Sequence, residues 1–221
     1  MWIFPTRSRL ANCQRFIKAW HNTNASTPVY VRLDNDDPEL TDLLKLDWPK
    51  EFEKVVGNRT RIGGAMQEMF KKYPNEEWYG MLADDLIPRT SHWDTNLIDK
   101  ALSHFISYAD DLHEKKIRIC HPCVHGDLVR LVGFFGLPTV EHFGTDTVLE
   151  EIHHKFKLDG LVESVVLEHA HFNFGQSELD QTYKESQSMK ELDKQAFRKW
   201  MAEEFDLIIE KINKHYGWLC E

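Results

Sequence analysis

Two adjacent carboxylates, Asp84 and Asp85, follow directly after an apolar run at residues 78–83. The run predicts a buried strand, so we expect both carboxylates at its carboxyl end. Adjacent carboxylates repel each other unless water, backbone amides or a cation neutralises them, and Mg²⁺ and Mn²⁺ prefer oxygen ligands. The stretch therefore predicts a divalent-cation site that a nucleoside diphosphate completes. The alternative interpretation is a polar turn before Pro88.

Polar side chains also follow the first two predicted strands. Thr6, Arg7 and Arg9 lie in the stretch PTRSR after the first apolar run, and Asp34 follows the run PVYVRL. Hydroxyl and guanidinium groups at a helix start suit phosphate or ribose, and a carboxylate accepts hydrogen bonds from a base or ribose. Each segment taken alone is equally consistent with a helix cap or a turn.

A fourth polar segment, RTRIGG, places Arg59 and Arg61 beside Gly63 and Gly64. Glycine permits the backbone to approach a ligand closely. In open α/β sheets, ligands bind outside the carboxyl ends of the strands. The four segments together therefore predict a nucleotide site at one edge of a sheet.

Strand and helix patterns alternate along the first two thirds of the 221 residues. Strands are expected at residues 2–4, 28–33, 53–57, 78–83, 116–120, 131–136 and 161–172. Helices are expected at residues 10–20, 65–73, 93–105 and 145–156, the last with Thr145 as N-cap, and one amphipathic helix at 189–216. The alternation predicts an α/β fold with a largely parallel sheet.

The order of these motifs resembles the GT-A class of nucleotide-sugar glycosyltransferases, closest to family-two-like members of bacteria and their phages. The resemblance rests on PTRSR, Asp34, the helix started by two glycines, GMLADDLIPRTSHWD and the later GTD, and it extends to about Tyr183. It implies a Rossmann-like, mixed, mostly parallel sheet flanked by helices. Length, apolar content and the lack of a dividing linker predict a single domain, residues 1–221. Within it the resemblance implies a nucleotide-binding half (1–95) and an acceptor and catalytic half (96–185), and it does not cover the helical segment (186–221).

The resemblance assigns Asp85 as a metal ligand, with Asp84 contacting ribose or a metal-bound water. Ala83 stands where many members have a further Asp. A late histidine often completes the metal site in this class, and the resemblance favours His169 or His171 without choosing between them. The two alternate along a predicted strand and so share one face, where a core or edge histidine pair is the alternative.

The resemblance also implies a nucleotide contact for each of seven further residues: Pro5, Thr6, Arg7, Arg9, Asp34, Arg61 and Gly63. Asp146, in GTD, lies where inverting members have the general base, and Thr145 replaces the Glu that usually precedes it. A carboxylate there can take the proton of a sugar hydroxyl as the hydroxyl attacks. The alternative for Asp146 is helix capping or compensation of the helix dipole.

These assignments imply a metal-dependent glycosyltransferase that uses Mn²⁺ or Mg²⁺. It would transfer a sugar, with inversion, from a nucleotide sugar, UDP-linked by preference, to a hydroxyl of a glycan, a protein or another acceptor. One alternative is a sugar-phosphate nucleotidyltransferase, which usually has a glycine-rich loop where this chain has FPTRSR. The other is a catalytically inactive, nucleotide-binding GT-A-like module, an alternative that Ala83 and Thr145 leave open.

Composition and the lack of certain motifs argue against several other classes. A net charge of −9 disfavours nucleic-acid binding through a broad basic face, and four cysteines are too few for a secreted disulfide scaffold. No apolar run approaches the length of a membrane span, so a soluble, cytoplasmic protein is expected. No phosphate loop of P-loop NTPases and no G-x-S-x-G elbow of common hydrolases occurs.

The histidines and cysteines of CHPCVHGD offer a competing chemistry. Cys120, His121, Cys123 and His125 are zinc-ligand types, but a structural zinc site usually draws a second ligand pair from elsewhere in the chain. We therefore favour a strand end that enters an acceptor-side loop, and the GT-A resemblance implies that His125 and Asp127 line the acceptor pocket. His153 and His154 are expected on a helix surface.

Overall fold

The structure is a computed structural model that describes residues 1–113 and 118–218. Its strands are β1 (Trp2–Thr6), β2 (Val29–Asp34), β3 (Phe52–Gly57), β4 (Trp78–Met81), β5 (Leu86–Pro88), β6 (Ile106–Asp110), β7 (Cys123–His125) and β8 (Leu161–His169). Its helices are α1 (Leu10–Asn22), α2 (Leu40–Lys45), α3 (Arg61–Lys72), α4 (Trp93–His104), α5 (Gly126–Val132), α6 (Thr147–Lys155), η2 (Phe172–Phe174), α7 (Gln181–Glu203) and α8 (Phe205–Tyr216).

The strands join into one sheet with the order β3-β2-β1-β4-β7-β6-β8-β5. β1 pairs in parallel with β2 and β4, and β2 pairs in parallel with β3, while β7 lies antiparallel between β4 and β6. The register places Thr6 opposite Leu33 and Asp34 opposite Gly57, so the ends of β1, β2 and β3 lie at the same edge. The expected mixed, mostly parallel sheet is confirmed.

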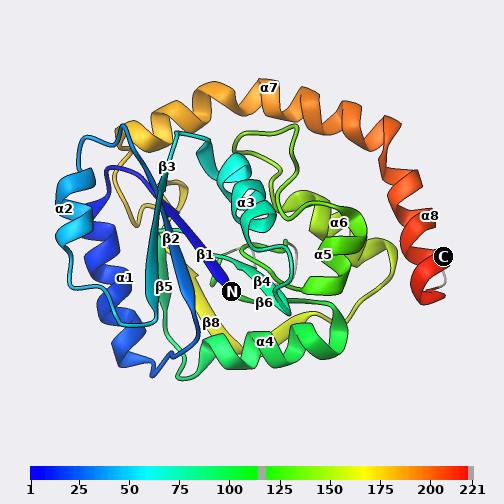
Figure 1. Cartoon of the computed structure of the whole chain (residues 1–221), viewed down its shortest axis with the longest axis horizontal. Coiled ribbons are helices and arrows are strands. Elements are labelled where there is room, and N and C mark those ends of the chain that lie inside the picture. Colours follow the sequence, from blue (N-terminus) through cyan, green and yellow to red (C-terminus); the bar gives the residue numbers. More distant parts are fainter. Residues whose placement is uncertain (114–117, 219–221) are drawn as a thin grey trace.

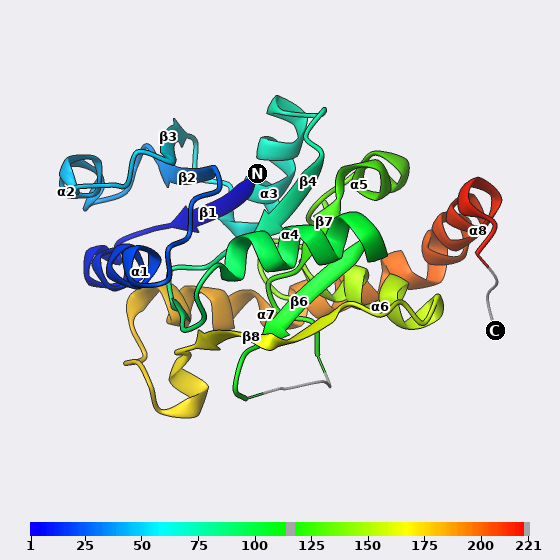
Figure 2. The same ribbon diagram turned by 90° about the horizontal axis from the view of Figure 1, so that it is seen from below.

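Alternate residues of β1, and Met1 just before it, enter two hydrophobic cores on opposite faces of the sheet. Trp2 and Phe4 pack with α1 and α4, whereas Met1 and Ile3 pack with α3, α5, α6 and α8. This follows from the two-residue period of a strand. Large aromatic rings fill the first core, where Trp2 lies 5.0 Å from Trp93 between ring centroids. Figure 2 shows α1 and α4 together on their side of the strands.

The C-terminal segment forms two helices instead of the single amphipathic helix expected at 189–216. α7 runs along one side of the whole molecule and α8 turns away at its end (Figure 1). The break falls at Glu204, between Trp200 and Phe205, and both aromatic side chains are buried in the second core. An apolar stripe alone cannot show this break, because both helices bury the same kind of face.

Two strand predictions in the middle of the chain did not hold. Residues 131–136 are not a strand, because α5 runs through Val132 and Gly133 ends it with φ +91°. A short apolar run fits a buried helix end as well as a strand. Of the strand expected at 116–120, residues 116 and 117 lie outside the described residues, and 118–120 form no strand.

The remaining predicted elements are confirmed with small shifts. The strand expected at 78–83 ends at Met81, so the two aspartates lie in the turn that follows it. Asp146, not Thr145, is the N-cap residue of α6. Sequence patterns missed β5, β6 and β7, which are three to five residues long. Among the helices of the described residues, none has both the length and the apolar character needed to cross a bilayer.

Candidate active site

A cavity of about 360 Å³ opens at the carboxyl edge of the sheet. Of the twelve residues that the resemblance assigned to the nucleotide, the metal or the general base, eleven line it: Pro5, Thr6, Arg7, Arg9, Asp34, Arg61, Asp84, Asp85, Asp146, His169 and His171. Gly63 lies outside this lining, within α3, where a Cβ would meet the backbone oxygen of Val140 at 2.4 Å. The structure thus gives Gly63 a packing role, letting α3 approach the loop before α6.

Asp84 joins the ends of β1 and β4 through a buried network. Its Oδ2 accepts a hydrogen bond from Thr6 Oγ1 at 2.7 Å, and its Oδ1 accepts one from Arg9 Nη1 at 2.8 Å. Burial raises the pKa of Asp84 above the ordinary carboxyl value, against the charge of Arg9. Both oxygens are therefore already engaged, and Asp84 holds Thr6 and Arg9 in place.

Asp85 points its carboxylate to the other side, toward β8. Its Oδ2 accepts a hydrogen bond from Tyr183 Oη at 2.7 Å and lies 3.4 Å from His169 Nε2. Its Oδ1 is buried and has no hydrogen-bond partner among the described residues. A buried carboxylate oxygen without a donor is costly unless a ligand satisfies it. This orphaned atom fits a bound cation.

His121 completes a set of three candidate metal ligands. One ligand atom each from Asp85, His121 and His169 lies within 4.8 Å of the other two. Burial lowers the pKa of His121 to about 3, helped by the charge of His169, so its imidazole is neutral and able to bind a metal. Burial acts against ionisation of Asp85, but His169 outweighs it and lowers the pKa of Asp85.

The structure separates the two histidines that the sequence left equivalent. His169, at the end of β8, faces Asp85, whereas His171 Nδ1 accepts a hydrogen bond from Asn173 N at 3.2 Å. The His171 ring packs against Tyr183 with centroids 4.7 Å apart. Across residues 1–113 and 118–218, no candidate ligand set includes His171. The geometry favours His169 as the metal ligand.

The CHPCVHGD stretch does not gather its four ligand types around one point. His121 faces the cavity, but Cys123 is fully buried in the core beside α4. His125 Nδ1 caps α5 by accepting a hydrogen bond from Asp127 N at 3.0 Å. The sequence did not assign His121 to the metal site, because its partners lie 36 and 48 residues away.

Asp146 stands at the start of α6 with its side chain in the cavity wall. Its carboxylate makes no capping hydrogen bond with the later amides of the first turn, whereas its place at the helix start is consistent with compensation of the helix dipole. Burial raises the pKa of Asp146, although nearby backbone amides and the charges of Arg118 and His169 act in the opposite direction. A carboxylate with a raised pKa is a stronger base than an ordinary one.

The loop that leads to Asp146 is held by Asp193 of α7. The buried Asp193 carboxylate accepts three backbone hydrogen bonds, from Glu141, His142 and Phe143, at 2.9–3.0 Å. In sequence, Asp193 is one of many charged residues of an amphipathic helix. Its role was missed because the partners are about 50 residues away and are backbone groups.

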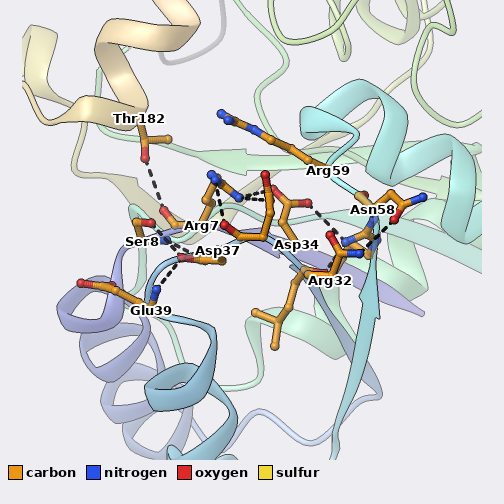
Figure 3. A network of polar contacts seen from close by, with 12 residues as sticks. Arg7, Ser8, Arg32, Asp34, Asp37, Glu39, Asn58, Arg59 and Thr182 are labelled. Carbon is orange, nitrogen blue, oxygen red and sulfur yellow. Dashed lines mark hydrogen bonds and ion pairs between the residues drawn. The ribbon is translucent and has the colours of Figure 1, made fainter.

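Asp34, the predicted nucleobase contact, is held by two arginines (Figure 3). Arg7 Nη1 lies 3.3 Å from Asp34 Oδ2 and 2.6 Å from Asp36 Oδ1, and the buried Arg32 reaches Asp34 Oδ1 at 3.4 Å. Burial raises the pKa of Asp34 against the charges of both arginines. Thr182 Oγ1 donates a hydrogen bond to the Arg7 carbonyl at 3.3 Å and connects this network to α7.

Two walls thus face each other across the cavity. The strand-end wall is formed by Thr6, Arg7, Arg9, Asp34, Asp84 and Asp85, and the helix wall by Thr182, Tyr183 and Glu185. Asp180, the N-cap residue of α7, adjoins the helix wall. Arg9 connects the two walls, because its Nε donates to Asp180 Oδ2 at 2.8 Å and its guanidinium lies 3.9 Å from the centre of the Tyr183 ring. The start of α7 is therefore part of the site.

The sequence matches no protein-family model and no curated protein. The structure is similar to the mannosyltransferase PcManGT of Pyrobaculum calidifontis, solved with GDP-Man and Mn²⁺, at 11% identity and a TM-score of 0.59, over 77% of this chain and 56% of that one. It is also similar to residues 1–349 of S. aureus TarS in complex with UDP, at 8% identity and a TM-score of 0.51, over 76% and 57% of the two chains.

A mycobacterial protein gives a similar match, at 12% identity and a TM-score of 0.51, over 76% of this chain and 66% of that one. This chain thus spans less than two thirds of the length of each of these three structures. At such low identity the likeness concerns the fold. The chain has the GT-A fold of nucleotide-sugar glycosyltransferases.

Proposed function

We propose that this chain is a metal-dependent glycosyltransferase of the inverting type. It transfers a sugar from a nucleotide sugar, UDP-linked by preference, to a hydroxyl of an acceptor glycan, protein or other molecule. The observation that carries the proposal is the set of Asp85, His121 and His169 in one cavity with Asp146. PcManGT, solved with GDP-Man and Mn²⁺, and TarS, solved with UDP, share the fold and support it.

The ligand types suit the proposed metal. One carboxylate and two imidazoles accept Mn²⁺ well once His169 releases its proton on binding, and the buried, unpartnered Oδ1 of Asp85 gains a partner. When bound, the cation stabilises the negative charge that develops on the departing diphosphate. Asp34 accepts a hydrogen bond from the nucleobase, and Thr6 and Arg7 lie beside the nucleotide.

Asp146 acts as general base in this proposal. Its carboxylate accepts the proton of the acceptor hydroxyl while that oxygen bonds to the anomeric carbon and the bond from this carbon to the diphosphate breaks. Attack on the face opposite the diphosphate inverts the anomeric centre. Asp193 holds the 141–143 loop and so keeps Asp146 facing the cavity.

A thermal-shift panel of nucleoside diphosphates and nucleotide sugars, with and without Mn²⁺, tests the proposal on wild type and Asp85→Asn. A ligand that binds only the native state raises the melting temperature by mass action. We expect one nucleotide to give a Mn²⁺-dependent shift in the wild type and none in Asp85→Asn. Asp99→Asn, an exposed change on α4, is the matched control and should behave as wild type.

Two results would count against the proposal. The absence of a shift with every nucleotide would remove the donor site. Binding without turnover, measured as release of nucleoside diphosphate from the bound nucleotide sugar with a panel of acceptors, would support the inactive nucleotide-binding alternative.

A further inference from the structure

Cys120 belongs to a second set of possible metal ligands beside the first. Its thiol, one carboxylate oxygen of Asp111 and one ring nitrogen of His169 all lie within 4.8 Å of one another. Asp111 follows β6, Cys120 precedes β7 and His169 ends β8. His169 N donates a hydrogen bond to the Asp111 carbonyl at 3.3 Å, which ties two of these segments together. Neighbouring strands thus position the set.

The second set differs from the first in its chemistry. A thiolate, an imidazole and a carboxylate form a ligand set of the kind that zinc binds, whereas Mg²⁺ takes oxygen ligands almost alone. At usual zinc bond lengths, tetrahedral ligand atoms lie about 3.3–3.8 Å apart. Because the three ligand atoms lie within 4.8 Å of one another, side-chain movements of about 1 Å would bring them to zinc-binding distances.

The cavity gives the ion a route in and a fourth ligand. Cys120 and His169 both line the cavity, and Asp111 is buried behind them. A zinc site with three protein ligands keeps one position for water or a substrate atom. Of the zinc-ligand types in CHPCVHGD, only Cys120 belongs to this set. Its partners Asp111 and His169 lie nine residues before it and 49 residues after it.

We propose that Asp111, Cys120 and His169 bind zinc or another thiophilic divalent cation. On binding, the Cys120 thiol releases its proton to solvent and the thiolate supplies both electrons of the metal–sulfur bond. Because His169 also belongs to the set of Asp85 and His121, zinc here either takes that ligand or repels a second dication nearby. Zinc therefore antagonises Mn²⁺, a consequence that rests on the proposed function, whereas zinc binding itself does not.

Titration of the purified chain with Co²⁺ tests the site directly, because cobalt bound to a thiolate gives a charge-transfer absorption in the near ultraviolet. We expect this band in wild type and its loss in Cys120→Ser and Asp111→Asn. It should persist in Asp85→Asn, the matched change in the first set, and in Cys123→Ser. Zinc affinity, from competition with Co²⁺, should fall more than about 100-fold in Cys120→Ser, since even outer-shell partners are worth about 10–100-fold.

The proposal is overturned if wild type shows no thiolate band, or if the band survives in Cys120→Ser. If either cysteine variant does not fold, the two aspartate variants provide the test: the band should be lost in Asp111→Asn and retained in Asp85→Asn. Antagonism is measured separately, as release of Mn²⁺ followed by its electron paramagnetic resonance signal while zinc is added. Failure of Mn²⁺ to bind at all would count against the proposed function and leave the cobalt result standing.

Discussion

The strand-end wall and the helix wall of the cavity differ in how their residues come to face each other. In the strand-end wall, parallel pairing aligns the ends of β1 and β2, so Thr6 and Asp34 are neighbours by register. In the helix wall, Tyr183 reaches Asp85 across 98 positions, and the adjoining Asp180 reaches Arg9 across 171. The first wall follows from strand topology, whereas the second depends on where one long helix docks.

The walls also differ in the type of contact that they make. The strand-end wall presents side chains to the cavity, while the helix wall mainly grips other site residues: Tyr183 holds Asp85, the adjoining Asp180 holds Arg9, and Asp193, further along α7, holds the 141–143 loop. We therefore expect substitutions in the strand-end wall and at Asp146 to remove chemistry, and substitutions along α7 to weaken it by degrees.

The largest effect is expected for Asp146→Asn. An amide cannot accept the hydroxyl proton, so kcat should fall by about 10²–10⁴-fold, while nucleotide binding is retained. Because burial raises the pKa of Asp146, the acid limb of wild-type kcat against pH should lie above the ordinary aspartate range, since the base must be ionised. Glu151→Gln, on the same helix, is the control. An unchanged kcat in Asp146→Asn would exclude it as the base.

Tyr183→Phe tests whether the helix wall orients the metal ligand. The change removes only the hydroxyl that bonds Asp85 and keeps the ring beside Arg9. Partners of this kind are worth about 10–100-fold in metal affinity, so Mn²⁺ binding measured by calorimetry should weaken within that range. Tyr216→Phe on α8 is the matched control. Equal affinity in both variants would contradict the orienting role.

Asp193→Asn should have a smaller effect on kcat, because it displaces the 141–143 loop and removes no reacting group. An amide keeps one acceptor oxygen for three backbone donors, so we expect a stability loss of about 1–3 kcal/mol in denaturant unfolding. Misplacement of the loop should lower kcat by roughly 10-fold with little change in nucleotide affinity. Asp206→Asn, at the exposed start of α8, serves for comparison. A stability loss with unchanged kcat would make Asp193 purely structural.

His153 tests a part of α6 that faces the core, away from both walls. It was expected on the helix surface but is buried, and neither ring nitrogen has a hydrogen-bond partner among the described residues. Burial lowers its pKa to about 4, helped by the charge of His154. A buried imidazole without polar partners must stay neutral in the folded state.

The sign of the pH effect follows from proton uptake. Between pH about 4 and about 6.5 the unfolded chain binds the His153 proton and the folded chain does not, so stability rises with pH across this window. The stability linked to a neutral His153 is fully present above pH 6.5 and is lost as the pH falls toward 4. The free energy of unfolding, measured with urea, should rise across this window by roughly 1–3 kcal/mol less in His153→Leu than in the wild type. An identical slope in both proteins would contradict the assignment.

How far the sequence predicted this molecule can be judged from particular elements. The strands β1, β2 and β3 were predicted from short apolar runs, and the helices α1, α3, α4 and α6 from apolar residues at helical spacing that face one core. The short strands β5, β6 and β7 were missed, because too few residues carry a period in each. The break between α7 and α8 was missed because both helices bury the same kind of apolar face, and the end of α5 because a short apolar run fits a strand equally well.

By itself, the sequence determined the α/β class, the carboxylates after β4 and the polar segments after β1 and β2. These are local patterns, and the rule that parallel strand ends share an edge converts them into one site. Three features follow from the packing of distant segments: His169 rather than His171 faces Asp85, His121 joins them, and Asp193 holds the loop before Asp146. Each of these depends on docking of distant segments, because no spacing along the chain encodes a contact made across a cavity.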